Sequence, residues 1–263
     1  MARKIVVTSG KGGVGKTTIC ANLGLALSEM NLKVLLIDVD FGLNNLDVVM
    51  GMENQNVYDL IDVLEGKCRA KQAILQDFYN PNLYVFPSNH TYSSVSIDGK
   101  KINEILNEVE DYFDYILVDC PAGIENGFFR ALEIADEAIV VTTPHISAIR
   151  DADKIINFLK SFNFETIGAV INRARGDLML DGDMVDIKTI EKYLKIPLYG
   201  VVPENDIISQ QLLIGGTVKN GEIRKAFNLI AKSINDGDTE IYDCTKKYKG
   251  FIGNIKKTLR RIV

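Results

Sequence analysis

The 263-residue sequence lacks an apolar run long enough to cross a membrane, and its interior has no linker rich in proline, glycine or serine. A membrane-spanning helix needs about 20 mainly apolar residues, and the apolar stretch behind the first residues is too short for a secretion signal. Without a linker, one domain is expected rather than two. The protein is therefore predicted to be cytoplasmic, and its apolar content of 46% is ample for a buried core.

Cysteine and histidine are also scarce. The chain has four cysteines and two histidines, namely Cys20, Cys68, Cys120, Cys244, His90 and His145. No CxxC pair occurs and neither histidine lies in a ligand pattern, so the sequence signals neither a zinc site nor a thiol redox centre. An iron protein of a similar fold would need paired cluster cysteines, and Cys120 has no evident mate. We expect Cys120 to be a small apolar filler at a strand end.

β-branched and aliphatic residues cluster in runs, with helical patterns between them. Strands are expected at 4–9, 33–40, 82–88, 115–121, 137–144, 166–172 and 197–204. Helices are expected at 17–30, 57–65, 100–111, 126–135, 147–162, 186–195, 206–213 and 221–234. Runs that are apolar at successive positions are typical of strands covered on both faces, hence of a mainly parallel sheet between helical layers. The predicted fold is a single doubly wound α/β domain, in which ligands bind beyond the carboxyl ends of the strands.

The first predicted strand leads into GKGGVGKTT (10–18), which matches the phosphate-loop pattern G-x-x-x-x-G-K-[ST]. Its glycines let the backbone N–H groups curl around phosphate oxygens, and the following helix N-terminus attracts negative charge. Lys16 is expected to reach the β- and γ-phosphates, and the Thr17 hydroxyl to ligate magnesium. The ATP-binding residues predicted in this loop are Lys11, Gly12, Gly13, Val14, Gly15, Lys16, Thr17 and Thr18. A chance match is the alternative, and the strand before and the helix after argue against it.

Three aspartates stand at the ends of two predicted strands. Asp119 closes YILVD, where P-loop enzymes place an acid that holds magnesium, and Asp38 and Asp40 close KVLLIDVD. A carboxylate at the latter end can hold magnesium or orient the attacking water. Such an aspartate more often only caps the next turn, yet three of them beside one phosphate loop favour a site. The residues alone thus make Asp119 a candidate for holding magnesium, and leave Asp38 and Asp40 as candidates either for holding magnesium or for orienting the water.

A second lysine in the loop and two further segments resemble one family. Lys11, DVDFGLNNLDVVMG (38–51) and ILVDCPAGIE (116–125) resemble the deviant Walker A ATPases, the ParA/MinD family of P-loop proteins. The similarity runs from residue 3 to the C-terminus and is closest to the members that determine the site of the division septum. It implies a magnesium-dependent ATPase that forms a homodimer when it binds ATP. The partners it implies are the division inhibitor MinC and a topological regulator such as MinE, and no direct nucleic-acid binding is expected.

The resemblance also implies catalytic roles. In that family the residue matching Lys11 crosses the dimer interface to the phosphates of the partner's ATP. By the same carry-over Lys16 is the phosphate-loop lysine, Asp40 positions the attacking water and Asp119 is the Walker B acid. The magnesium site that the resemblance implies consists of Thr17, Asp38 and Asp119. Lys11, Lys16 and Asp40 are thus the expected catalytic residues. From the residues alone a solvated Lys11 competes with this interpretation, although two cations crowded into one loop repel each other unless each serves a phosphate group.

The adenine contacts are expected at a different strand end. By the resemblance, Asn172 and the turn at Pro203 and Glu204 match positions where the family holds the base. A lone asparagine at a strand end is more often a turn residue, which is the alternative here.

The segment 250–263 has one apolar and one basic face when it is placed on a helical wheel. The residues predicted to contact a membrane are Phe251, Ile252, Ile255, Leu259 and Ile262 on the apolar face and Lys256, Lys257, Arg260 and Arg261 on the basic face. This pattern is typical of a helix that lies in the headgroup layer of an anionic bilayer. Packing on the domain's own core is the alternative, and the absence of any acidic residue from 244 onward argues against it.

These patterns predict three parts and one location. An ATPase domain is expected over 1–235, a polar and basic spacer over 236–249, and a membrane-targeting helix over 250–263. The protein should therefore attach peripherally to the cytoplasmic face of the cell membrane. Because MinD-like switches recruit a division inhibitor, the resemblance implies a role in positioning the septum.

The charge distribution bears on two alternatives. The net charge is −5, and because seven basic residues fall after 243, the preceding body carries 23 basic against 35 acidic residues. A DNA-partition ATPase of the ParA type would need a basic surface on that body, so its acidity disfavours this alternative. A flagellar-number regulator similar to FlhG is the other alternative, although such chains usually carry an additional helical segment before the phosphate loop.

Overall fold

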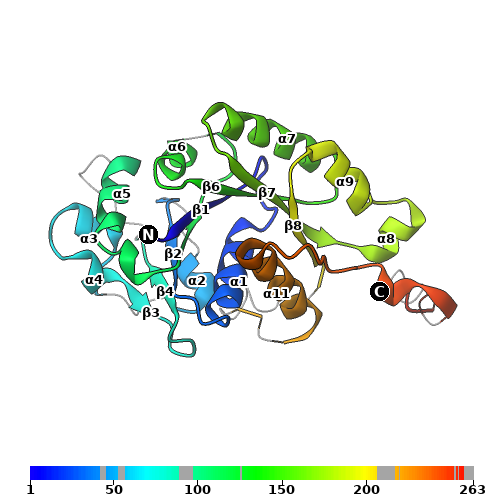
Figure 1. Cartoon of the computed structure of the whole chain (residues 1–263), viewed down its shortest axis with the longest axis horizontal. Coiled ribbons are helices and arrows are strands. Elements are labelled where there is room, and N and C mark those ends of the chain that lie inside the picture. Colours follow the sequence, from blue (N-terminus) through cyan, green and yellow to red (C-terminus); the bar gives the residue numbers. More distant parts are fainter. Residues whose placement is uncertain are drawn as a thin grey trace.

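The computed structural model describes residues 1–41, 46–52, 57–88, 97–124, 126–205, 217–218, 220–251, 253 and 255–257. Within them an eight-stranded sheet has the order β3-β4-β2-β5-β1-β6-β7-β8 and is parallel except between β3 and β4 (Figure 1). The strands are β1 (Arg3–Thr8), β2 (Val34–Asp38), β3 (Leu75–Gln76), β4 (Leu83–Phe86), β5 (Tyr115–Asp119), β6 (Glu137–Thr142), β7 (Thr166–Ala174) and β8 (Leu198–Pro203). The predicted mainly parallel sheet is confirmed.

Burial of the central strands explains why they could be recognised in the sequence. Every residue of β2 and β5 is buried, as expected for strands covered on both faces. All seven predicted strands are present, whereas β3 was not predicted. It has two residues, neither of them buried, and so carries no apolar run that a sequence pattern could reveal.

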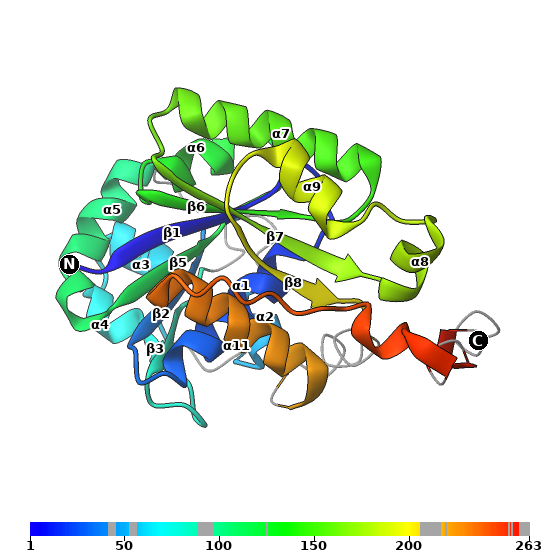
Figure 2. The ribbon, with the colours of Figure 1, turned by 45° about the vertical axis from the view of Figure 1, so that its right-hand side comes forward.

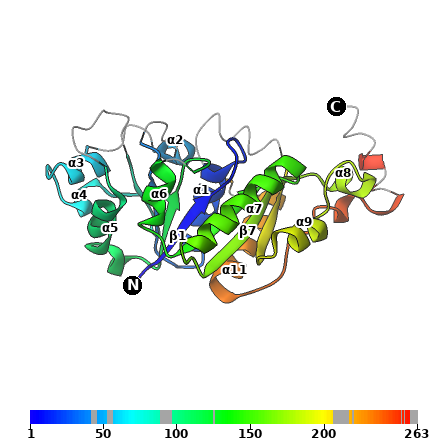
Figure 3. The same cartoon turned by 90° about the horizontal axis from the view of Figure 1, so that it is seen from above.

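Helices cover both faces of the sheet, as Figures 2 and 3 show. One layer consists of α1 (Lys16–Ser28), α2 (Leu46–Met50) and α11 (Gly221–Asp236). The other contains α3 (Leu60–Leu64), α4 (Ala70–Ala73), α5 (Gly99–Asn107), η1 (Glu110–Tyr112), α6 (Asn126–Leu132), α7 (Ile146–Ser161), α8 (Gly176–Asp181) and α9 (Ile187–Leu194). The short helices α2, α4 and α8 were not predicted, because so few turns leave little periodicity to detect. The predicted helix 206–213 lies outside the described residues.

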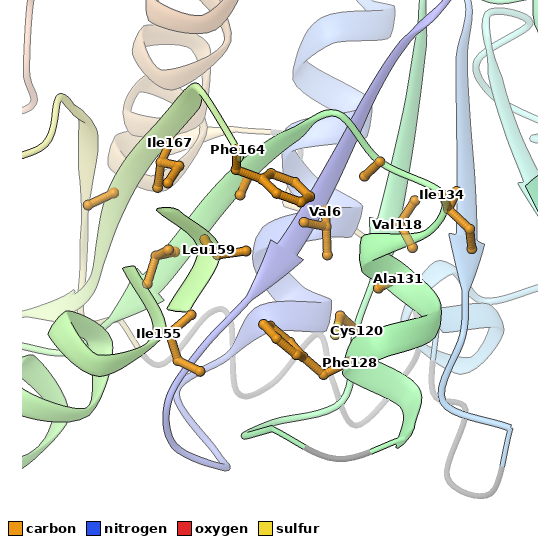
Figure 4. Close-up of a cluster of buried hydrophobic side chains, with 14 of the residues drawn as sticks. Val6, Val118, Cys120, Phe128, Ala131, Ile134, Ile155, Leu159, Phe164 and Ile167 are labelled. Atoms are coloured by element: carbon orange, nitrogen blue, oxygen red, sulfur yellow. The ribbon is translucent and has the colours of Figure 1, made fainter. Parts of the chain in front are cut away.

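Successive side chains of the central strand enter two different cores. In β1, Ile5 and Val7 pack with α1 and α11, while Val6 packs toward α6 and α7. Figure 4 shows the second core, where Phe128 of α6 and Leu159 of α7 approach Val6. The two helical layers therefore pack on opposite faces of one sheet. This rigid arrangement holds the loops at the carboxyl edge of the sheet in place.

The strand order brings the carboxyl ends of β2, β5 and β1 side by side. The neighbouring parallel strands β2, β5 and β1 all end at the same edge of the sheet, where β1 runs into the loop before α1. The chain moves from β1 to β2 on one side and later continues into β6 on the other side of β1. Such a reversal of strand order opens a crevice at the carboxyl edge, which is the usual binding place in this fold class.

The segment after α11 packs along the body. Ile241 and Tyr242 pack against the core on the α7 side, and Cys244 and Tyr248 are buried. The packed part of the chain therefore reaches beyond residue 235 to the 3-10 turn η2 (Lys246–Tyr248). In Figure 2 this segment runs from α11 past β8 toward α8.

The beginning of the predicted C-terminal helix lies within the described part of the chain. The described residues between 250 and 257 are helical, and both Phe251 and Ile255 expose much of their side chains. The predicted membrane residues outside the described part are Ile252, Leu259, Arg260, Arg261 and Ile262. Among the described residues, none of the helices combines the length and the apolar character that spanning a bilayer requires.

Candidate nucleotide-binding site

The loop between β1 and α1 has the backbone of an anion cradle. Gly13 and Gly15 have positive φ values of 74° and 96°, which residues with a side chain rarely adopt. A Cβ atom at Gly12 or Gly13 would meet nothing within 4 Å, so this side of the loop is open to a ligand. The helix α1 begins directly behind it at Lys16 and offers its free N–H groups. The arrangement suits a group of phosphate oxygens.

Two neighbouring segments brace the loop from behind. The buried Asn172 amide donates a hydrogen bond of 2.8 Å to the Val14 carbonyl, which joins β7 to the loop. The Gly123 N–H donates to the Ser9 carbonyl at 3.0 Å, which joins the loop after β5 to the first residues of the phosphate loop. Glycine is needed at 15 for a second reason, since a Cβ there would lie 2.4 Å from the Asn172 amide nitrogen. Tertiary contacts therefore fix the shape of the cradle.

Two of the predicted magnesium ligands face each other across neighbouring strands. Asp38 of β2 and Asp119 of β5 are partners in the strand register, and both are buried. Asp38 accepts a hydrogen bond of 2.8 Å from the Asp40 N–H. The Oδ1 atom of Asp119 is buried and has no hydrogen-bond partner. A buried carboxylate oxygen without a partner is costly in a folded protein, unless a cation satisfies it.

The electrostatics of Asp119 fit a cation site. Burial and the nearby Asp38 carboxylate raise the pKa of Asp119 to about 8, while a hydrogen bond with Thr17 and the charge of Lys16 act to lower that pKa. Asp119 and Thr17 therefore lie together, as expected for oxygen ligands of magnesium. No three His, Cys, Asp or Glu side chains in the described part could hold a metal on their own. A magnesium ion at this edge would thus share its coordination with phosphate oxygens and water.

The predicted catalytic residues stand around the same cradle. Lys16 is partly exposed at the start of α1, Asp40 is partly exposed just beyond β2, and Lys11 is exposed. Nothing in the described part of the chain forms a salt bridge with the Lys11 side chain. Lys11 is therefore available to a ligand or to a second subunit.

The three residues predicted for adenine lie at the ends of β7 and β8. Pro203 is the last residue of β8 and pairs with Ala174 of β7. The Glu204 N–H donates 3.0 Å to the Ala174 carbonyl, and the Glu204 carboxylate lies 3.9 Å from Arg175. The Asn172 amide is engaged with the phosphate loop, which connects the two halves of the proposed site. Their contacts with the base remain a prediction.

Sequence patterns did not single out Arg130 on α6. Its side chain is half-buried, and its Cζ atom lies 5.1 Å from the centre of the Phe41 ring, next to Asp40. The only signal in the sequence is that Arg130 follows five residues behind the ILVDCPAGIE segment. Phe41, its neighbour in the structure, lies 89 positions earlier in the sequence. No local sequence pattern could therefore have revealed this contact.

The fold and this loop define a class, and comparisons with known proteins give the family. Residues 2–170 match the family model described as "AAA domain". The septum site-determining protein MinD of Bacillus subtilis is 42% identical over 261 residues, which is 97% of both chains. MinD in the MinC:MinD cell division complex of Aquifex aeolicus superposes with a TM-score of 0.82 at 38% identity, over 91% of this chain and 97% of that one.

A third relative carries the cofactor expected here. MinD of Pyrococcus horikoshii, solved with Mg-ADP, has a TM-score of 0.75 and 32% identity, and the match covers 89% of this chain and 96% of that chain. Fold and phosphate loop together make this protein a P-loop ATPase of the deviant Walker A class. Within that class, the chain belongs to the MinD family of septum site-determining ATPases. This finding favours the septum-positioning interpretation over the flagellar and DNA-partition alternatives.

Proposed function

We propose that this protein is an ATP-dependent membrane switch that positions the division septum. ATP binding would form a homodimer, the dimer would dock two C-terminal helices on the membrane, and hydrolysis would release them. The open phosphate cradle and the exposed Lys11 support the first step. Relatives of the same family that determine septum sites support the biological role.

The single observation that carries the membrane proposal is the exposure of the C-terminal helix. Phe251 is 83% exposed and Ile255 is 49% exposed, and these positions lie one turn apart on one side of the helix. Large apolar side chains left in water favour burial elsewhere, at up to about 1.5–3 kcal/mol each. The adjacent Lys256 is exposed, and each basic residue near an anionic leaflet contributes about 1 kcal/mol. One such helix binds weakly, so pairing two on a dimer would make attachment depend on nucleotide.

In the proposed reaction, the chain's own residues bind and orient ATP. The N–H groups of the phosphate loop and Lys16 would hold the phosphates, and Thr17 and Asp119 would hold a magnesium ion. When bound, that ion neutralises phosphate charge as bonds to oxygen break. Asp40 would orient the attacking water. Lys11 of the partner subunit would stabilise the negative charge that develops on the transferred group.

The proposed partners follow from the family. A solved relative forms a complex with MinC, and by analogy this protein would recruit a MinC-type division inhibitor when it is dimeric on the membrane. A MinE-type regulator would then stimulate hydrolysis. Both would be found at the cytoplasmic face of the cell membrane, where the dimer is attached.

Vesicle sedimentation tests the proposal directly. The full-length protein is mixed with vesicles containing anionic phospholipid in the presence of magnesium and either ATP or ADP. We expect more protein to sediment with ATP than with ADP, and expect removal of 250–263 to abolish the difference. A Phe251→Ser, Ile255→Ser variant should behave like the truncation, with Tyr193→Ser, another exposed apolar site, as the matched control. Equal sedimentation with ATP and ADP would contradict the proposal.

A further inference from the structure

Arg130 connects α6 to the residues just after β2. It lies on α6, the helix that follows β5 and its carboxyl-terminal loop. Its guanidinium carbon is 5.1 Å from the centre of the Phe41 ring, a distance typical of a cation–π contact. Its Nε atom donates 3.4 Å to the Asn126 carbonyl on the same helix, which steadies the side chain. Arg130 thus joins α6 to the loop behind β2, which carries Asp40.

The charged Arg130 side chain is half-buried, which is unusual for a guanidinium. Burial lowers the pKa of Arg130, and the Asp40 carboxylate is the first of the charges that act in the opposite direction. No salt bridge to Arg130 is formed within the described part of the chain. Partial burial of a guanidinium without a paired carboxylate costs free energy of desolvation. The nearby acidic edge is therefore the main source of favourable charge for Arg130.

Three carboxylates gather at the carboxyl edge of the sheet. Asp38, Asp40 and Asp119 converge there, and both of the other carboxylates raise the pKa of Asp119. Lys16 approaches this group from the phosphate loop. The Asp40 carboxylate also lies close enough to Arg130 to act on the charge of its guanidinium. The positive charge of Arg130 therefore attracts the Asp40 carboxylate toward α6.

We propose that Arg130 is a positioning residue for ATP hydrolysis, because it holds the Asp40–Phe41 corner against α6 and so fixes the direction of the Asp40 carboxylate. The stack on Phe41 sets the position of the corner, and the charge of Arg130 sets the position of the carboxylate. This inference rests on the proposed role of Asp40 in orienting the attacking water. It does not require Arg130 to touch ATP.

A purely structural role for Arg130 makes different predictions. If Arg130 only filled space under Phe41, its loss would lower stability and would disturb ATP binding and turnover together. A positioning role instead leaves the phosphate cradle intact, since that cradle is braced by Asn172 and Gly123. In that case kcat falls while KM for ATP changes little, because the lost interaction acts after ATP is bound.

The test compares Arg130→Met and Arg130→Lys with the unmodified protein in ATP hydrolysis with magnesium and anionic vesicles. Methionine keeps an apolar stem but removes the charge, and we expect kcat to fall about tenfold or more, with KM for ATP and the binding of a fluorescent ATP analogue within about twofold. Lysine restores the charge and should recover part of kcat. Arg69→Met removes an exposed arginine at the N-cap of α4 and is the matched control. Thermal unfolding of each variant reports its folding.

An Asp40→Asn variant separates this inference from the assignment of Asp40. We expect Asp40→Asn to lose turnover more severely than Arg130→Met. If Asp40→Asn is inactive and Arg130→Met hydrolyses ATP at the normal rate, the inference about Arg130 is wrong while the role of Asp40 stands. If Asp40→Asn keeps normal turnover, the proposed role of Asp40 itself is wrong. Parallel losses of stability, ATP binding and kcat in Arg130→Met would establish the structural role and overturn the inference.

Discussion

Asn172 braces the phosphate loop through one buried hydrogen bond. Its amide donates to the Val14 carbonyl at 2.8 Å, and leaving a buried carbonyl without a donor costs about 1–3 kcal/mol. We expect Asn172→Ala to lower the free energy of unfolding by that amount and to weaken ATP binding. Urea unfolding and titration with a fluorescent ATP analogue measure the two effects. Asn157→Ala on the exposed face of α7 is the control, and a change of similar size in both variants would contradict the bracing role.

The raised pKa of Asp119 predicts that a proton is released when magnesium and nucleotide bind. Because burial and Asp38 raise its pKa to about 8, the Asp119 carboxyl is mostly protonated at pH 7 without metal. A cation lowers that pKa again, so binding of Mg-ATP at pH 7 should release about one proton. Calorimetry in buffers with different ionisation enthalpies measures the number released. The value should fall as the pH rises toward 9, and Asp119→Asn should release none from this site.

The raised pKa of Asp119 also determines how the stability of the metal-free protein depends on pH. The folded pKa of Asp119 lies above its unfolded value of 3.8, so the folded state holds more protons between about pH 4 and pH 8. The Asp119 contribution to stability therefore decreases as the pH rises through this window. Magnesium with nucleotide should remove the decrease.

At the scale of elements, the packed segment after α11 fixes where the C-terminal helix begins. Gly176 at the start of α8 lies so close to this segment that a Cβ would be 2.0 Å from the Cys244 carbonyl oxygen. Backbone on both sides must shift to admit a methyl group, which costs about 1–3 kcal/mol. We expect Gly176→Ala to loosen residues 241–248, with faster trypsin cleavage at Lys246 and Lys247. Leu180→Ala on the exposed side of α8 is the control, and equal cleavage rates would show that the segment is held elsewhere.

The elements themselves could be predicted to different degrees. β2 and β5 were predictable because burial on both faces leaves an uninterrupted apolar run in the sequence. The helix α8 and the edge strand β3 were not, since each is too short to show a period. The sequence of 236–249 predicts a polar spacer. In the structure, however, Cys244 and Tyr248 are buried, and Cys244 packs on Met179 of α8, a neighbour that no local pattern reveals. Packing partners distant in sequence decided these cases.

At the scale of the whole molecule, the proposed switch would depend on joining two copies. Lys11 is exposed beside the open cradle, and the proposed dimer brings two C-terminal helices to one membrane. Linking two weak sites raises avidity by about 10²–10⁴ without any new contact. We expect Lys11→Ala to bind ATP but to remain monomeric, to hydrolyse little ATP and to lose the ATP-dependent gain in vesicle binding. Light scattering and sedimentation measure these outcomes, and normal turnover by the variant would exclude the role of Lys11.

The sequence by itself determined the class of protein, the sheet and the phosphate loop, because each depends on residues that are adjacent along the chain. Glycines with positive φ, a lysine and a threonine at the start of a helix act locally, so their spacing is informative. Only the tertiary structure decided which groups meet: Asp38 with Asp119, Asn172 with Val14, and Arg130 with Phe41. Each of these contacts joins segments that are distant in sequence, and their energies come from burial and charge that exist only after the sheet has formed.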